Sequence, residues 1–221
     1  MNRLILKYGY PITAVILAIL AWVVYRIIAA GGSGLIGFVV VAVMVWGLGT
    51  LVFLHFWPTF TYSAYKRAIL RHGFGGGPIP INTLYATPHR ASPVASNASL
   101  LATGTDDVLY VGGVLDLSQG PQILHVPDMA GRYYSVQFTD PSDGTNFADV
   151  GKRTTGTAAG EYLISGPGWK GTVSQGMTPI AAPNKSVLVF GRVMVESDSD
   201  VPTAYGLARQ IQLTPLTPLN H

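Results

Sequence analysis

Two long apolar stretches occupy the N-terminal part of the chain. Leu35–Trp57 is an apolar run without a formally charged residue, and Tyr8–Tyr25 is also uncharged and mostly apolar. Since a membrane-spanning helix needs roughly 20 apolar residues, the pattern predicts transmembrane helices at about residues 9–28 and 35–57. The small residues 29–34 between them can close a tight turn but cannot re-cross a bilayer. The two predicted spans therefore form a helical hairpin.

The pattern changes after Trp57. Residues 58–72 carry aromatic and aliphatic side chains on one helical face and basic side chains on the other, which is typical of an interfacial helix. The apolar face holds Tyr62, Tyr65, Ile69 and Leu70, and the basic face holds Lys66, Arg67 and Arg71. Gly73 is expected to end this helix. Residues 58–78 are therefore predicted to form an interfacial helix followed by a glycine-rich hinge.

From Ile79 onward, short apolar runs alternate with Gly, Pro, Asp, Asn and Ser. Many short strands separated by turn residues are typical of an antiparallel β-sandwich or a barrel-like domain, which is predicted for residues 79–221. Strands are expected at Val108–Leu117, Gln122–Val126, Tyr133–Thr139, Glu161–Ser165, Ser186–Val195 and Gln210–Leu213, with a helix at Pro202–Gln210. The chain is thus predicted to be mainly β, preceded by a two-helix transmembrane hairpin.

Charge is distributed unevenly along the chain. Residues 1–72 contain six Lys and Arg and no Asp or Glu, whereas residues 73–221 contain eight basic and eleven acidic residues. This asymmetry suits an anionic lipid surface. Because the second part lacks a basic stripe interleaved with aromatic residues, a nucleic-acid partner is not expected. By the positive-inside rule, the basic flanks of the two spans favour a cytoplasmic β domain.

The inventory of reactive residues is short. The chain has no cysteine, which excludes disulfides, thiolate metal sites and a cysteine nucleophile. None of its five histidines has the spacing of a metal motif. No Gly-x-Ser-x-Gly nucleophile elbow occurs in the chain. We therefore expect no metal and no cofactor, and the sequence contains no recognisable catalytic motif.

An ordered series of short motifs runs through the predicted β domain. It begins with Asn82-Thr83 and Asp107-Val108-Leu109-Tyr110, and continues through Leu115–Pro121, Pro127-Asp128, Arg132-Tyr133-Tyr134, Gln137–Asp140, Arg153–Thr157, Gly166–Gly171 and Phe190–Val193. This series resembles the domain-of-unknown-function family 1254 over roughly residues 79–217. Each motif alone is weak, whereas their order is specific.

The resemblance implies an all-β fold and no particular reaction, since the family has no settled activity. Members often carry a companion β domain of family 1214, which this sequence does not contain, so a separate protein of that kind is an expected partner. Members are also often exported. This conflicts with the cytoplasmic side that the charges favour, and the two signals leave the side of the β domain open.

Two groups of side chains are candidates for chemistry. Carboxylates at strand ends can act as general acids or bases, although Asp also caps turns and pairs with Arg. Aromatic side chains can form walls for a sugar or a lipid head group, although they also pack in cores. The acid–base candidates are Asp107, Asp116, Asp140, Asp143 and Arg153, and the ligand-binding candidates are Tyr110, Tyr133 and Trp169.

These features favour a non-catalytic accessory subunit of a membrane protein complex. Its helical hairpin would dock against other membrane subunits, and its β domain would cap the assembly. The alternative is a membrane-tethered hydrolase or a binding module that acts on an envelope lipid or glycan. An enzyme should bring two or more of the candidate acids together in a pocket, whereas an accessory subunit should leave them scattered.

Overall fold

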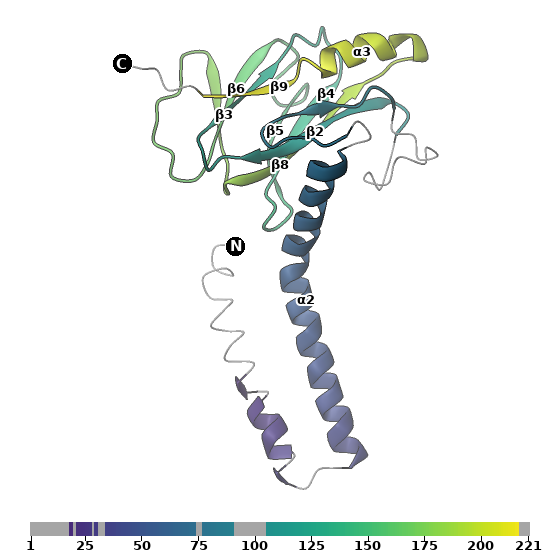
Figure 1. The fold of residues 1–221 in the computed structure, drawn as a ribbon, viewed down its shortest axis with the longest axis vertical. Coiled ribbons are helices and arrows are strands. Elements are labelled where there is room, and N and C mark those ends of the chain that lie inside the picture. Colours follow the sequence, from purple (N-terminus) through teal and green to yellow (C-terminus); the bar gives the residue numbers. More distant parts are fainter. Residues whose placement is uncertain are drawn as a thin grey trace. The chain divides into compact units, whose positions relative to one another are not determined.

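The structure is a computed structural model of the 221-residue chain. It describes residues 18–19, 21–27, 29–30, 34–73, 77–90 and 105–216 (Figure 1). The chain divides into two compact units, Met1–Trp57 and Pro58–His221. Helix α2 (Leu35–His72) contributes to both units, and all of the strands belong to the second.

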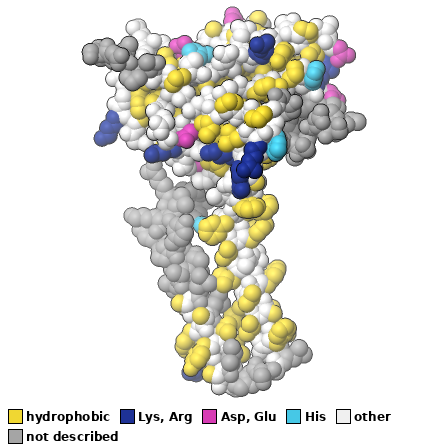
Figure 2. Space-filling model, viewed as in Figure 1, with side chains coloured by type: hydrophobic (Ala, Val, Ile, Leu, Met, Phe, Trp, Pro, Cys, Tyr) yellow, Lys and Arg dark blue, Asp and Glu magenta, His cyan; other side chains and the backbone are white. Residues whose placement is uncertain are grey.

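Helix α2 contains a stretch that is long and apolar enough to cross a membrane. This stretch is Gly37–Trp57, and among the described residues no other helix meets the same length and composition. Its hydrophobic side chains are exposed (Figure 2). Phe38 and Trp46, for example, are 72% and 73% exposed. One apolar helix is therefore present. The predicted first span, at about residues 9–28, falls largely outside the described residues, and the two-helix hairpin stays a prediction.

The predicted interfacial helix is the C-terminal part of α2. The helix passes through Pro58 without a break and ends at His72. Proline removes one backbone N–H from the hydrogen-bond ladder, and α2 nevertheless continues beyond it. Gly73 ends the helix as predicted, with its N–H bonded to the carbonyl oxygen of Ile69 at 2.9 Å. Its φ of +61° favours glycine, and a Cβ there would lie 2.0 Å from the oxygen of Gly77.

The second unit contains two packed β-sheets and not a closed barrel (Figure 1). Sheet A has the order β1-β2-β8-β4-β5, and sheet B has the order β7-β6-β3-β9. Sheet A consists of β1 (Tyr85–Ala86), β2 (Val108–Asp116), β8 (Ser186–Met194), β4 (Tyr134–Thr139) and β5 (Asn146–Gly151). Sheet B consists of β7 (Met177–Ala181), β6 (Gly160–Ser165), β3 (Gln122–Val126) and β9 (Gln212–Pro215). The remaining elements are a 3₁₀ turn, η1 (Asp198–Asp200), and helix α3 (Val201–Ala208).

The mainly β prediction is confirmed, with one correction to strand direction. Every pairing is antiparallel except that of β6 with β7, which is parallel and makes sheet B mixed. Strands β2, β3, β4, β6 and β8 lie where the apolar runs predicted them. Strands β1, β5 and β7 were not predicted. Pro179 within β7 argues against a strand by its sequence alone, and the structure accommodates it because β7 is an edge strand.

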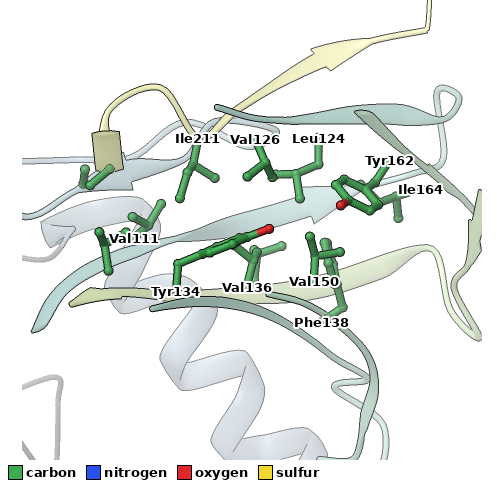
Figure 3. Close-up of a cluster of buried hydrophobic side chains, with 14 of the residues drawn as sticks. Val111, Leu124, Val126, Tyr134, Val136, Phe138, Val150, Tyr162, Ile164 and Ile211 are labelled. Carbon is green, nitrogen blue, oxygen red and sulfur yellow. The ribbon is translucent and has the colours of Figure 1, made fainter. Parts of the chain in front are cut away.

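The main core lies between the two sheets. Side chains of the inner faces meet there, as Figure 3 shows for Leu124, Tyr134, Phe138 and Ile164. Alternate residues of β8 also point into this core. Val187, Val189 and Val193 are fully buried and belong to the same cluster.

The outer face of sheet A is also covered. Ile69 near the end of α2, Ile79 and Val114 of β2 form a second buried cluster, against which Tyr65, Tyr85 and Leu188 pack. Since β2 contributes Leu109 and Leu115 to the main core and Val114 to this outer cluster, it is buried on both faces. The last turns of α2 are thus part of the β domain.

This second cluster predicts a large effect for one substitution in α2. Ile69→Ala removes a fully buried side chain and should lower the free energy of unfolding by about 2–4 kcal/mol. Thermal unfolding of the detergent-solubilised chain, followed by near-ultraviolet circular dichroism, measures the change. Ile81→Ala is the matched control, because Ile81 is 42% exposed and should cost less than about 0.5 kcal/mol. Equal effects would show that α2 does not pack on the sheet.

Candidate functional site

Polar side chains gather at the end of sheet A where β2 ends and β8 begins. The register places Asp116 opposite Ser186, and Thr139 opposite Leu188. Asp140, which follows Thr139, therefore lies at the same end of the sheet as Asp116. Two of the five candidate acid–base residues are brought to one end of the sheet by β2 and β4, the two strands that flank β8.

Asp116 stabilises a turn at this end of sheet A. One of its carboxylate oxygens accepts a hydrogen bond from the backbone N–H of Ser118 at 2.9 Å. The pKa of Asp116 is lowered by hydrogen bonds from the hydroxyl and the backbone of Ser118, and further by the charges of Lys66 and Lys185. Its backbone is also fixed, since its N–H donates to Asn82 at 2.8 Å and its carbonyl accepts from the Asn82 amide at 3.1 Å. Asp116 is a charged, well-anchored turn residue.

Asp140 and Asp143 hold the turn between β4 and β5. Asp140 is 6% exposed, and one carboxylate oxygen accepts from the backbone N–H of Ser142 at 2.8 Å and from the Asn184 amide at 2.7 Å. Asp143 accepts from both the backbone N–H and the hydroxyl of Thr145, at 3.0 and 2.6 Å. These contacts are the side-chain-to-backbone bonds by which Asp stabilises turns.

Helix α2 adds two polar groups to the same region, through contacts that sequence reasoning missed. The hydroxyl of Tyr62 lies 2.8 Å from that of Ser186, and the ammonium of Lys66 donates to Ser186 at 3.3 Å. Burial raises the pKa of Tyr62, and the hydrogen bond with Ser186 partly offsets this. The i, i+4 spacing of Tyr62 and Lys66 places them on one helix face. The assignment of Lys66 to an opposite, basic face was therefore wrong.

The other candidates lie at the opposite end of the sheet or in its core. Asp107 precedes β2 and is exposed, roughly 30 Å along the strand from Asp116. The guanidinium of Arg153 lies 5.4 Å from the centre of the Tyr133 ring. Tyr110 is 2% exposed and packs on Phe190, with ring centres 5.1 Å apart. The structure thus separates the five acid–base candidates into two groups.

Trp169 lines a hollow of about 320 Å³ next to the polar end of the sheet. Its walls are the turn between β2 and β3 (residues 117–121), the start of the β6–β7 connection (residues 166–169), and Lys185 just before β8. Backbone hydrogen bonds hold the walls, including one from the N–H of Leu117 to the carbonyl of Lys185 at 2.7 Å. This hollow is the candidate binding site of the domain.

A polar series also crosses the outer face of sheet B. His125 of β3 contacts Glu161 of β6 through Nδ1 at 3.0 Å and Thr214 of β9 through Nε2 at 2.6 Å. The order of carboxylate, imidazole and hydroxyl is that of a nucleophile activated by a base. Cross-strand polar contacts of this kind also stabilise sheets. Among the described residues, no group of three or more His, Cys, Asp or Glu is placed to hold a metal ion.

The family comparison decides the identity of the β domain. The sequence model of the family described as "Protein of unknown function (DUF1254)" matches residues 81–215. The chain belongs to the DUF1254 family. This confirms the resemblance found in the motifs, and it places both walls of the hollow and the ends of β2 and β8 inside the matched DUF1254 region.

Two solved structures resemble the chain. The VPA0106 protein of Vibrio parahaemolyticus is 24% identical, with a TM-score of 0.55 over 72% of this chain and 36% of that one, and it supports the fold. An uncharacterised protein from Burkholderia cenocepacia is 13% identical, with a TM-score of 0.35 over 52% and 31%. The DUF1254 chain thus spans about a third of the length of each. No curated protein matches it.

The turn at Asp116 generates a testable pH dependence. Ser118→Ala removes the hydroxyl that lowers the pKa of Asp116, so the pKa should rise towards its ordinary value of 3.8. Because the folded pKa lies below the unfolded one, the stabilisation exists above about pH 4 and is lost as the pH falls through the folded pKa. Ser118→Ala should therefore cost about 1 kcal/mol at pH 6 and nearly nothing at about pH 2.

Carbon-13 NMR of the Asp116 carboxyl group measures the pKa, and unfolding at several pH values measures the stability. Ser197→Ala is the control, since the hydroxyl of Ser197 contacts Ser199 and not Asp116. An unchanged Asp116 midpoint in Ser118→Ala would contradict the assignment.

Proposed function

We propose that this DUF1254 protein is a non-catalytic accessory subunit of a membrane protein complex. Its apolar helix, together with the predicted first span at residues 9–28, docks against other membrane subunits, and the β domain caps the assembly. The observation that carries the proposal is the stretch Gly37–Trp57 of α2, which is long and apolar enough to cross a membrane. Only 6% of its most apolar part is buried within the described chain. A β-domain protein of family 1214 is one proposed partner.

Small residues on α2 support helix–helix docking. A Cβ built on Gly47 or on Gly49 meets no atom of the described residues within 4 Å. Glycines on an open helix face let another helix approach closely in a membrane. Because residues i and i+2 lie on different faces of a helix, each glycine offers its own open surface, which the described part of the chain does not use.

The positions of the candidate acids also favour a non-catalytic role. Asp107 and Arg153 lie away from the end of the sheet that holds Asp116, Asp140 and Asp143. The carboxylates of these three residues accept hydrogen bonds from the turns that follow them. A general acid or base must instead reach a proton of the substrate.

Subunit association provides the first test. Native mass spectrometry of the chain, extracted from its own membrane in a mild detergent, should show other membrane proteins bound in fixed stoichiometry. Gly47→Leu should reduce this association at least tenfold, because its side chain would block the close approach of a partner helix. The same change should leave the isolated chain folded, since a Cβ at this position meets no described atom within 4 Å.

Trp46→Leu is the matched control, because Trp46 is also exposed and its substitution leaves Gly47 unchanged. A chain that is recovered alone, or only as a homo-oligomer, would contradict the accessory role.

The alternative function is a membrane-tethered hydrolase that acts on an envelope lipid or glycan ester. The series Glu161, His125 and Thr214 favours it, because the imidazole lies between a carboxylate and a hydroxyl. In such an enzyme, the Thr214 hydroxyl would attack an acyl carbon while its proton passes to Nε2 of His125. The proton would then pass to the leaving alcohol, and water would release the acyl group.

A fluorophosphonate probe separates the two functions. An accessory subunit should remain unlabelled, because a threonine in a cross-strand contact is not a strong nucleophile. A hydrolase should instead gain the phosphonyl mass on Thr214, with loss of fluoride, and should lose this labelling in His125→Ala. Intact-protein and peptide mass spectrometry distinguish the outcomes, and Thr178→Val serves as the control on β7, the opposite edge strand of sheet B.

A further inference from the structure

The hollow beside Trp169 is built from rigid parts. Trp169 is anchored through its backbone N–H, which donates to the carbonyl of Gly166 at 3.3 Å, and Gly120 donates to Leu117 at 3.4 Å. The two walls also touch each other, because a Cβ on Gly166 would lie 3.2 Å from that of Leu117. Ligand sites are commonly preformed concavities of this size.

The indole of Trp169 lies in close contact with the backbone of Gly171. A Cβ on Gly171 would lie 2.3 Å from Cζ2 and 2.7 Å from Cε2 of the indole, so the ring lies directly on the backbone of residue 171. Trp169 is nevertheless only half-buried, and it lines the hollow. An aromatic ring that is fixed against the backbone and lines a hollow can form a platform for an apolar face of a ligand.

The remaining lining is made of glycine and proline with Leu117 and three polar residues, and it carries one positive charge. Lys185 is exposed, and within the described residues no ion pair holds its ammonium group. Ser118 and Gln119 lie on the opposite wall. Among the described residues, no carboxylate lines the hollow. The nearby Asp116 accepts a hydrogen bond from Ser118.

We propose that this hollow binds a sugar residue that carries a carboxylate or a phosphate group. The apolar face of the sugar ring stacks on the indole of Trp169, its hydroxyl groups meet Gln119 and the backbone of the turns, and its anionic group meets Lys185. The volume of about 320 Å³ accommodates one sugar unit. A lipid chain is a poor fit, because glycine, proline and polar residues make up most of the lining.

This site is independent of the accessory role, which rests on α2. Loss of sugar binding leaves subunit association unaffected, and loss of subunits leaves sugar binding unaffected. The two proposals can therefore fail separately.

Trp169 itself reports on binding in a full-length variant. The chain has four tryptophans, and Trp22→Phe, Trp46→Phe and Trp57→Phe leave Trp169 as the sole fluorophore. This variant, reconstituted in lipid nanodiscs, is titrated with glucuronate, glucose 6-phosphate, glucose and inorganic phosphate. At least one of the two anionic sugars should change the fluorescence in a saturable way, and glucose should bind at least about tenfold more weakly.

Substitutions in the hollow complete the test. Lys185→Ala should weaken binding of the anionic sugar about tenfold, to the level of glucose. Lys170→Ala is the matched control, because Lys170 is exposed next to Trp169 but does not line the hollow, and it should change the affinity less than about twofold. Gly171→Ala places a methyl group where the indole of Trp169 now lies and must displace the ring. It should abolish binding of the anionic sugar, measured by calorimetry, while the far-ultraviolet circular dichroism stays unchanged.

Several results would overturn the proposal. One is the absence of saturable binding by both anionic sugars, and another is equal affinity for glucose and glucuronate. Inorganic phosphate binding as tightly as glucose 6-phosphate would show an anion site without sugar recognition. A preference for glucuronate over glucose 6-phosphate, or the reverse, supports the proposal and identifies which anionic group the site takes.

Discussion

The burial of strand β2 on both of its faces is the constraint on which the rest of the β domain depends. An antiparallel sheet commonly leaves one face to water, but the outer face of sheet A bears Val114 and Leu188 and requires an apolar cover. The cover comes from Ile69 and Tyr65 of α2, together with Ile79 just beyond the helix. The residues that follow the apolar stretch of α2 are therefore part of the core of the domain, and their removal would expose apolar surface.

The regular parts of this fold could be predicted from the sequence, and the exceptions have identifiable causes. Strands such as β3 and β8 are rich in β-branched and aliphatic residues between turn residues, which is the strongest strand signal. Strand β7 contains Pro179, and β5 has few apolar residues, so neither produced this signal. The parallel pairing of β6 with β7 depends on a crossover between them, which local pattern does not determine. The continuity of α2 through Pro58 likewise overrides a local helix-breaking signal.

The hydrogen-bonded turns near the candidate site could be predicted, because each is made by residues close together in the sequence. Asp116, Asp140 and Asp143 each accept a hydrogen bond from the backbone of the residue two positions later, and a Ser or Thr stands there in all three cases. This Asp-x-Ser/Thr pattern was visible in the sequence and favours turn formation over catalysis. The contacts of Tyr62 and Lys66 with Ser186 join residues 124 and 120 positions apart. No local pattern could indicate them.

The start of β8 joins the hollow to the last turns of α2. Ser186 contacts Tyr62 and Lys66 of α2, and the preceding residue, Lys185, lines the hollow and holds the turn after β2 through its carbonyl oxygen. Lys185 and Ser186 are adjacent, and their backbone pairs with the end of β2 and the turn that follows it, so the last turns of α2 and the wall of the hollow are mechanically joined. Allosteric coupling would further require two discrete arrangements of this junction. The dense bonding around Ser186 instead favours a single arrangement, in which α2 helps to keep the hollow preformed.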